Sequence, residues 1–169
     1  FEWKEILEQE VIKVLLGVPK LKIHAKLCII KKRVHNKTIQ YGFVSTGNLN
    51  EKTAKVYGDH CLLTSNRNVM ADINKVFRYL ENWKVGTAPL SQCKTLLICP
   101  TNMRKQIDVL INREIKLAKA KKTASIIIKV NSLSDAHLIQ KLHEAALAGV
   151  EIKLIVRGIF CAKFEQKKY

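Results

Sequence analysis

The second half of the chain alternates strand-like and helix-like segments, and this order restricts the fold more than any other feature of the sequence. Runs rich in apolar and β-branched residues predict strands over 95–99, 125–130 and 151–156. Apolar residues at helical spacing predict helices between them, over about 101–118 and 134–149. The order strand–helix–strand–helix–strand predicts a parallel sheet with right-handed crossovers.

Polar residues follow two of these predicted strands. Asn131 and Ser132 come directly after one strand, and Arg157 and Gly158 come directly after the last. Ligands of open parallel sheets bind beyond the carboxyl ends of the strands. We therefore expect these residues to lie at a binding edge.

The first half of the chain shows a different pattern. Segments 23–32 and 39–46 flank a polar turn and predict a β-hairpin. Residues 11–17 and 61–64 are short apolar runs that predict two further strands, and a helix is expected after Ser65 or Asn66. The first half should therefore contain a mixed sheet beside a helix.

A stretch rich in small and polar residues, 84–92, separates the two patterns and predicts a linker. We expect two consecutive α/β domains, the carboxyl-terminal part of one in residues 1–88 and the amino-terminal part of another in residues 91–169. The chain has no initiator methionine, and we interpret it as an excised piece of a longer protein.

The chain is strongly basic, with 30 Lys and Arg residues against 14 Asp and Glu residues and a net charge of +16. The excess is spread over both halves, which predicts a polyanionic partner such as polyphosphate, nucleotides, nucleic acid or an anionic membrane surface. No secretion signal or run of eighteen apolar residues occurs, and the five cysteines form no C-x-x-C pair. These features favour a reducing cytoplasm, are compatible with a peripheral position at the membrane, and argue against zinc.

A histidine and a lysine stand two residues apart in a strand-like run that is otherwise apolar. His24 and Lys26 should share one face of the strand, and a Ser-Thr-Gly-Asn-Leu-Asn turn follows at 45–50. An imidazole can attack phosphorus while an ammonium neutralises oxygen charge. Backbone amides and carboxamides of a small-residue turn can hold phosphate oxygens, so Asn48 joins the candidate site.

The order of several motifs resembles that of the catalytic core of the polyphosphate kinase family. The matching segments run through essentially the whole chain: Gly-Val-Pro at 17–19, Leu-Lys-Ile-His-Ala-Lys-Leu at 21–27, Thr-Gly-Asn-Leu-Asn-Glu-Lys-Thr-Ala at 46–54, Val-Tyr-Gly-Asp at 56–59, Asp-Val-Leu-Ile-Asn-Arg-Glu-Ile at 108–115, Asn-Ser-Leu at 131–133 and Leu-Ile-Val-Arg-Gly-Ile at 154–159. The resemblance implies phospholipase D-like domains and a phosphotransferase that moves the ATP γ-phosphate reversibly onto inorganic polyphosphate with Mg²⁺.

The resemblance also implies roles for individual residues. His24 matches the histidine that becomes phosphorylated, and Lys26 and Asn48 match the other polar members of this half of the site. Tyr57 matches the tyrosine that stacks on adenine, and Arg157 matches an arginine that binds nucleotide phosphate. The expected partners are ATP or ADP and inorganic polyphosphate, with no specific nucleic acid. A homo-oligomer of the full-length protein is compatible with the sequence.

Two departures leave alternatives open. Phospholipase D-type enzymes carry an aspartate five residues after the lysine, where this chain has Lys31, which weakens but retains a phosphodiesterase or nuclease alternative. The family's second catalytic histidine and its magnesium-associated arginines have no match here, so no metal ligand is assigned and we expect the fragment to be inactive alone. A non-catalytic polyanion-binding module is the third interpretation.

Overall fold

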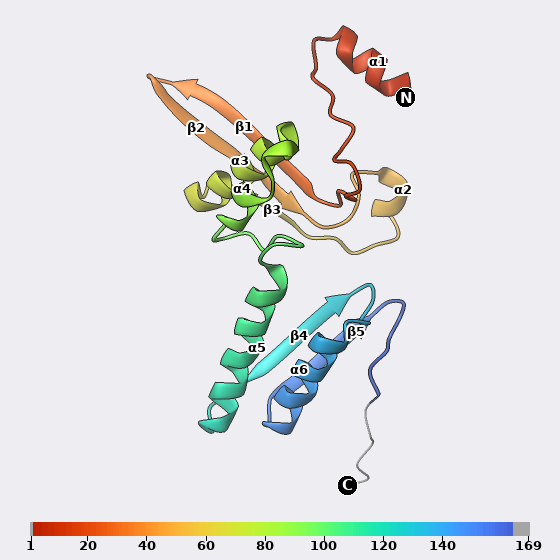
Figure 1. Cartoon of the computed structure of the whole chain (residues 1–169), viewed down its shortest axis with the longest axis vertical. Coiled ribbons are helices and arrows are strands. Elements are labelled where there is room, and N and C mark those ends of the chain that lie inside the picture. Colours follow the sequence, from red (N-terminus) through yellow and green to blue (C-terminus); the bar gives the residue numbers. More distant parts are fainter. Residues whose placement is uncertain (1, 164–169) are drawn as a thin grey trace. The chain divides into compact units, whose positions relative to one another are not determined.

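The computed structural model describes residues 2–163, which divide into two compact units, Phe1–Asn102 and Met103–Tyr169 (Figure 1). A division into compact units does not define domains, so the assignment of residues 1–88 and 91–169 to two consecutive domains stays a prediction. No helix within the described residues is both long and apolar enough to cross a membrane.

The first unit is built on a β-hairpin. Strands β1 (Lys26–Val34) and β2 (Lys37–Ser45) pair in antiparallel register, with Lys26 opposite Ser45. His35 and Asn36 form the two-residue turn with φ angles of 44° and 59°, the positive values that a type I′ hairpin requires. The hairpin predicted from the sequence is confirmed.

A third strand, β3 (Cys61–Thr64), pairs antiparallel with β2 and gives the order β1-β2-β3. The expectation of a mixed sheet is wrong for the described strands of this unit, because each neighbouring pair is antiparallel. Residues 11–17 form no strand. Val11 has a φ of 60° and is 95% exposed, and its segment meets no partner strand to complete a ladder.

Helix α3 (Arg67–Glu81) covers one face of the hairpin (Figure 1). The Asn66 side chain caps it by accepting hydrogen bonds from the backbone amides of Asn68 and Val69. The fully buried side chains of Met70 and Ile73 pack against apolar side chains of the two strands, Leu27, Ile29 and Val44. This core fixes which face of the hairpin remains open.

The first unit also contains short helical segments. They are α1 (Glu2–Gln9), α2 (Glu51–Ala54), the 3₁₀ turn η1 (Trp83–Val85) and α4 (Ala88–Ser91). Leu90 of α4 is buried against Val76 and Tyr79 of α3. The stretch predicted as a linker therefore contains a packed helical turn.

A buried carboxylate explains why residues 95–99 are not a strand, contrary to the prediction. Asp72 of α3 is 2% exposed, and its Oδ2 accepts hydrogen bonds from the amides of Lys94, Thr95 and Leu96 at 3.0, 2.7 and 3.0 Å. These three amides bind a side chain and cannot enter a ladder. The loop belongs to the first unit, so the sheet of the second unit lacks the expected third strand.

The second unit is a parallel β-α-β arrangement with an additional helix. Its elements are α5 (Met103–Lys119), β4 (Ser125–Val130), α6 (Ala136–Leu147) and β5 (Glu151–Val156), and β4 pairs with β5 in parallel. Alternate residues of the strands pack with Ile111, Leu142 and Ala145 into one core. The two strands, both helices and the parallel pairing are confirmed, and Asp135 is the N-cap of α6.

Candidate functional site

The side chains of His24 and Lys26 are in contact. Lys26 is the first residue of β1, and His24 lies just before it in an extended segment. The Lys26 Nζ is 2.8 Å from Nδ1 and 3.4 Å from Nε2 of the imidazole, and it donates to the His24 carbonyl oxygen at 3.2 Å. His24 is exposed, so its imidazole is accessible to a ligand.

The turn at 45–50 begins beside this pair, because Ser45 is the register partner of Lys26. Its conformation is held from the loop before β3. The Thr46 hydroxyl donates to Asp59 Oδ1 at 3.0 Å and accepts from the His60 amide at 3.0 Å, and the Thr46 amide donates to the His60 carbonyl at 2.9 Å. Gly47 has a φ of 69°, and a Cβ at this position would collide with the Asp59 carboxylate.

The two asparagines of the turn have different surroundings. The Asn50 side chain caps α2 by accepting hydrogen bonds from the amides of Lys52 and Thr53 at 3.0 and 3.1 Å, which is a structural role. The Asn48 side chain is exposed and makes no hydrogen bond within residues 2–163. Asn48 is therefore the carboxamide that can meet a ligand at this end of the hairpin.

Tyr57 lies in the same unit, in the turn that follows α2. Its amide donates to the Thr53 carbonyl at 3.1 Å, and its side chain is 46% exposed. An exposed ring on a loop anchored by its backbone is suited to stacking on a base.

Arg157 belongs to the second unit and lies where the sequence predicts, at the carboxyl end of β5. Its amide donates to the Val130 carbonyl at 3.0 Å, and its guanidinium Nη2 donates to Asn131 Oδ1 at 3.0 Å. Gly158 has a φ of 146°, and a Cβ there would lie 2.5 Å from the Asn131 carbonyl oxygen. The two loops at this edge are thus packed closely together, and Asn131 orients the arginine.

Sequence reasoning missed two acidic residues that hold other side chains in place. Asp59 holds the 45–50 turn through Thr46, and only its place in a matched motif distinguishes it in the sequence. In the second unit, Asp108 of α5 accepts a hydrogen bond from His137 Nε2 of α6 at 2.8 Å, a contact between residues 29 positions apart that no local pattern indicates.

The strongest electrostatic feature of the first unit is structural. Burial raises the pKa of Asp72, but the hydrogen bond from Lys75 and those from the amides of Thr95 and Leu96 outweigh it, so the pKa stays below its usual value. Burial also raises the pKa of the Cys93 thiol, and the nearby Asp72 charge adds to the effect. A buried neutral thiol of this kind is not a nucleophile.

No three His, Cys, Asp or Glu side chains converge to hold a metal ion within the described part of the chain. We assign no metal ligand to these residues. Magnesium remains an implication of the family resemblance.

Comparison with known proteins agrees with the fold and with the order of the motifs. Residues 1–85 match the family model "Polyphosphate kinase C-terminal domain 1", and residues 96–169 match "Polyphosphate kinase C-terminal domain 2". The two halves of the chain thus correspond to two consecutive C-terminal domains of one family of phosphotransferases. The chain belongs to the polyphosphate kinase family.

Individual relatives support the same conclusion. A polyphosphate kinase of Vibrio cholerae is 42% identical over 160 residues, which cover 94% of this chain and 22% of the relative. One from Staphylococcus saprophyticus is 37% identical over 161 residues, with 95% of this chain and 22% of the relative covered. The crystal structure of polyphosphate kinase from Porphyromonas gingivalis has a TM-score of 0.82 at 36% identity, covering 95% of this chain and 24% of that one. The phospholipase D-like α/β fold is confirmed, and the chain spans about a fifth of the length of its curated relatives.

Proposed function

We propose that the chain carries half of the active site of a polyphosphate kinase that transfers the ATP γ-phosphate reversibly to inorganic polyphosphate through a phosphohistidine on His24. The observation that supports this most directly is the 2.8 Å contact between the Lys26 ammonium and the exposed His24 imidazole. Phosphoryl transfer needs in-line positioning and charge neutralisation above all, and this pair can supply both.

The transfer proceeds in two balanced steps. A ring nitrogen of His24 attacks the γ-phosphorus of ATP, the bond to the β-phosphate oxygen breaks, and ADP leaves with that electron pair. A terminal oxygen of polyphosphate then attacks the phosphoramidate, the P–N bond breaks, and the imidazole recovers its lone pair. The polymer is one phosphate longer, and the same path in reverse forms ATP.

Lys26 has two successive partners in this scheme. An ammonium that donates to Nδ1 occupies a ring lone pair, and a ring with that lone pair engaged is a poorer nucleophile. The incoming γ-phosphate offers the ammonium charged oxygens, which bind it more strongly than a neutral nitrogen does. Phosphate binding therefore draws Lys26 from the ring to the phosphate and frees the nucleophile where it is needed.

The other predicted site residues bind the substrates. The free Asn48 carboxamide donates to phosphate oxygens beside His24, Tyr57 stacks on the adenine of ATP, and Arg157, oriented by Asn131, holds nucleotide phosphate. The net charge of +16 attracts both polyanionic substrates.

The phosphodiesterase alternative gains no support from the position of Lys31. Side chains of a strand alternate between faces, so Lys31, five residues after Lys26, points to the opposite face of β1. It lines a groove beside α3 and does not share a face with Lys26. A side chain on that face is directed away from a substrate bound at His24 and Lys26.

Labelling with ATP tests the proposal. In the full-length protein that carries this chain, [γ-³²P]ATP should label His24 with a phosphate that is labile in acid and stable in base, as a phosphoramidate is. His24→Ala should abolish both the label and polymer synthesis. His35→Asn is the control, because His35 lies in the hairpin turn with a φ of 44°, a conformation that asparagine tolerates.

The proposal is wrong if the acid-labile label persists in the His24→Ala protein. We expect the isolated 169-residue chain to remain unlabelled, because the family resemblance implies a second catalytic histidine that has no match in it.

A further inference from the structure

The segment from Val11 to Asn50 contains eight Lys and Arg residues and no Asp or Glu. Four of the eight lie in the distal half of the β1–β2 hairpin: Lys31, Lys32, Arg33 and Lys37. All four are exposed, and none forms an ion pair within residues 2–163. This hairpin arm therefore concentrates uncompensated positive charge well away from His24.

The register of the hairpin directs part of this charge toward α3. Leu27 and Ile29 face α3, and alternation along the strand places Lys31 and Arg33 on the same face. Lys31 lies opposite Gln40 of β2, and opposite residues of an antiparallel pair share a face. Lys31 lies five positions after Lys26 in β1, a distance of about 17 Å along the strand.

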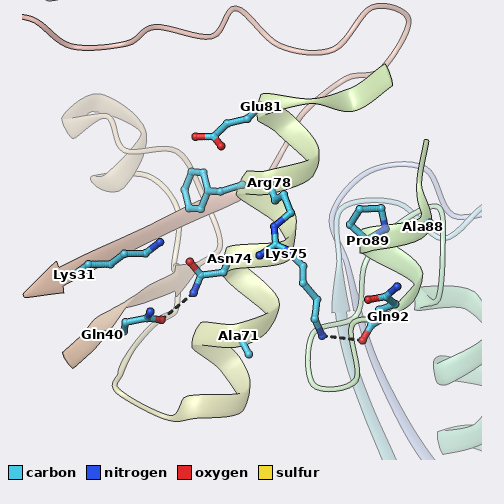
Figure 2. Close-up of a pocket in the computed structure, with 11 residues that line it drawn as sticks. Lys31, Gln40, Ala71, Asn74, Lys75, Arg78, Glu81, Ala88, Pro89 and Gln92 are labelled. Atoms are coloured by element: carbon cyan, nitrogen blue, oxygen red, sulfur yellow. Dashed lines mark hydrogen bonds between the residues drawn. The ribbon is translucent and has the colours of Figure 1, made fainter. Parts of the chain in front are cut away.

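An open groove of about 810 Å³ lies where the hairpin arm meets α3. Figure 2 shows Lys31 extending from β1 toward the helix, with Arg78 and Lys75 on the helix side. Lys75 is engaged by Asp72 and by the Gln92 carbonyl, whereas Lys31 and Arg78 have no side-chain partner within the described residues. Glu81 is the one acidic residue of the lining.

One carboxamide of the groove, that of Gln40, is oriented as a donor, whereas Asn74 uses both of its N–H groups inside the protein. Asn74 Nδ2 donates to Gln40 Oε1 at 2.8 Å and to the Met70 carbonyl at 2.8 Å. With its oxygen occupied by Asn74, Gln40 has its NH₂ group left to offer to the groove. Two unpaired cations and a directed amide donor are complementary to oxyanions and provide little for a cationic or apolar ligand.

We propose that this groove and the hairpin arm form a second binding site, distinct from the His24 site, for a linear phosphate polyanion. That the polyanion is inorganic polyphosphate rests on the proposed function. Single-stranded nucleic acid is a poorer fit, because its binding sites stack bases on exposed aromatic rings and the one aromatic residue of the lining, Phe77, is half-buried. A polymer held here stays attached to the protein while its reacting end is exchanged at His24.

Fluorescence anisotropy of the 169-residue chain with labelled polyphosphate tests the site over a series of salt concentrations. The triple variant Lys31→Gln, Arg33→Gln, Arg78→Gln should bind at least about fivefold more weakly at low salt, because three ionic contacts are lost. The slope of log K against log salt should fall by about two, since each phosphate contact contributes roughly 0.7. The charge-preserving triple Lys31→Arg, Arg33→Lys, Arg78→Lys should retain the affinity.

A second triple removes the same charge elsewhere. Lys105, Lys119 and Lys122 are exposed in the second unit, and their replacement by glutamine should change the affinity by less than about twofold. An equal loss in both triples, or no loss in the first, overturns the proposal. The assignment to polyphosphate is refuted if orthophosphate displaces the labelled polymer as well as unlabelled polyphosphate does. It is also refuted if an RNA oligomer binds as tightly as polyphosphate and loses affinity equally in the first triple variant.

The test is independent of the mechanism at His24. In a His24→Ala background the first triple should cause the same fold-loss of affinity. A loss that disappears in that background would show that the groove residues act through the His24 site, and would overturn the proposal of a separate site.

Discussion

Replacement of Asp72 by alanine should be among the most damaging single changes in the first unit. The carboxylate is 2% exposed and accepts three backbone amides on one oxygen and the Lys75 ammonium, at 2.8 Å, on the other. Truncation leaves the three backbone amides without their acceptor, leaves Lys75 with only the Gln92 carbonyl, and frees the loop that follows α4. Each backbone donor left unsatisfied costs about 1–3 kcal/mol, so we expect a loss of roughly 3 kcal/mol or more, a large part of the stability of a marginal domain.

The isosteric change Asp72→Asn separates charge from shape. The amide oxygen can still accept the loop amides, but the NH₂ group then faces the Lys75 ammonium, so we expect a loss of about 1–3 kcal/mol. Glu81→Ala is the matched control on the same helix, because Glu81 is exposed and should change stability by less than about 0.5 kcal/mol.

Urea unfolding followed by Trp83 fluorescence measures these differences, with Trp3 replaced by phenylalanine so that one tryptophan reports.

The lowered pKa of Asp72 also predicts a pH dependence of the stability. Its contribution is complete above the unfolded carboxyl pKa of about 3.9 and is lost as the pH falls through the lower folded value. The stability difference between the wild type and Asp72→Asn should therefore shrink below about pH 4.

The reasoning fails if Asp72→Ala lowers the free energy of unfolding by less than about 1 kcal/mol at pH 7. It also fails if the wild-type amides of residues 94–96 exchange with solvent as fast as those of an open loop, because three amides bound to a buried carboxylate should be protected.

Two further predictions concern the candidate site. Gly47→Ala should destabilise the protein by about 1–2 kcal/mol or more, because alanine is strained at a φ of 69° and its Cβ would collide with Asp59. Gly149→Ala is the control, since a Cβ at that position meets open space and should cost only the backbone strain at a φ of 92°. Equal losses of the two variants in urea unfolding would show that the collision does not matter. Lys26→Ala should slow phosphoryl transfer in the full-length protein by about 10²–10³-fold in rapid-quench assays, because one transition-state charge contact is removed, and a change in KM alone would contradict that role.

Local patterns in the sequence were sufficient for the elements whose stability is local or strictly periodic. The hairpin followed from two strand-like segments on either side of a polar turn, in which His35 and Asn36 adopt positive φ angles. The apolar face of α3 followed from helical spacing, with Ser65 or Asn66 as the expected cap, and β4 and β5 followed from alternation along each strand. The proximity of His24 to Lys26 also followed, because residues two apart in extended chain share a face.

Tertiary contacts decided the rest, because they join residues that no local pattern connects. Residues 95–99 have the composition of a strand, yet Asp72, more than twenty positions earlier, takes the amides of Thr95 and Leu96 that a ladder would have used. Residues 11–17 found no partner strand, and the hold of Asp59 on Thr46 depends on two loops meeting at the end of β2. A backbone donor binds whichever acceptor the folded chain brings to it. The sequence alone therefore determined which segments could form strands and helices, and the tertiary structure determined where their hydrogen bonds were made.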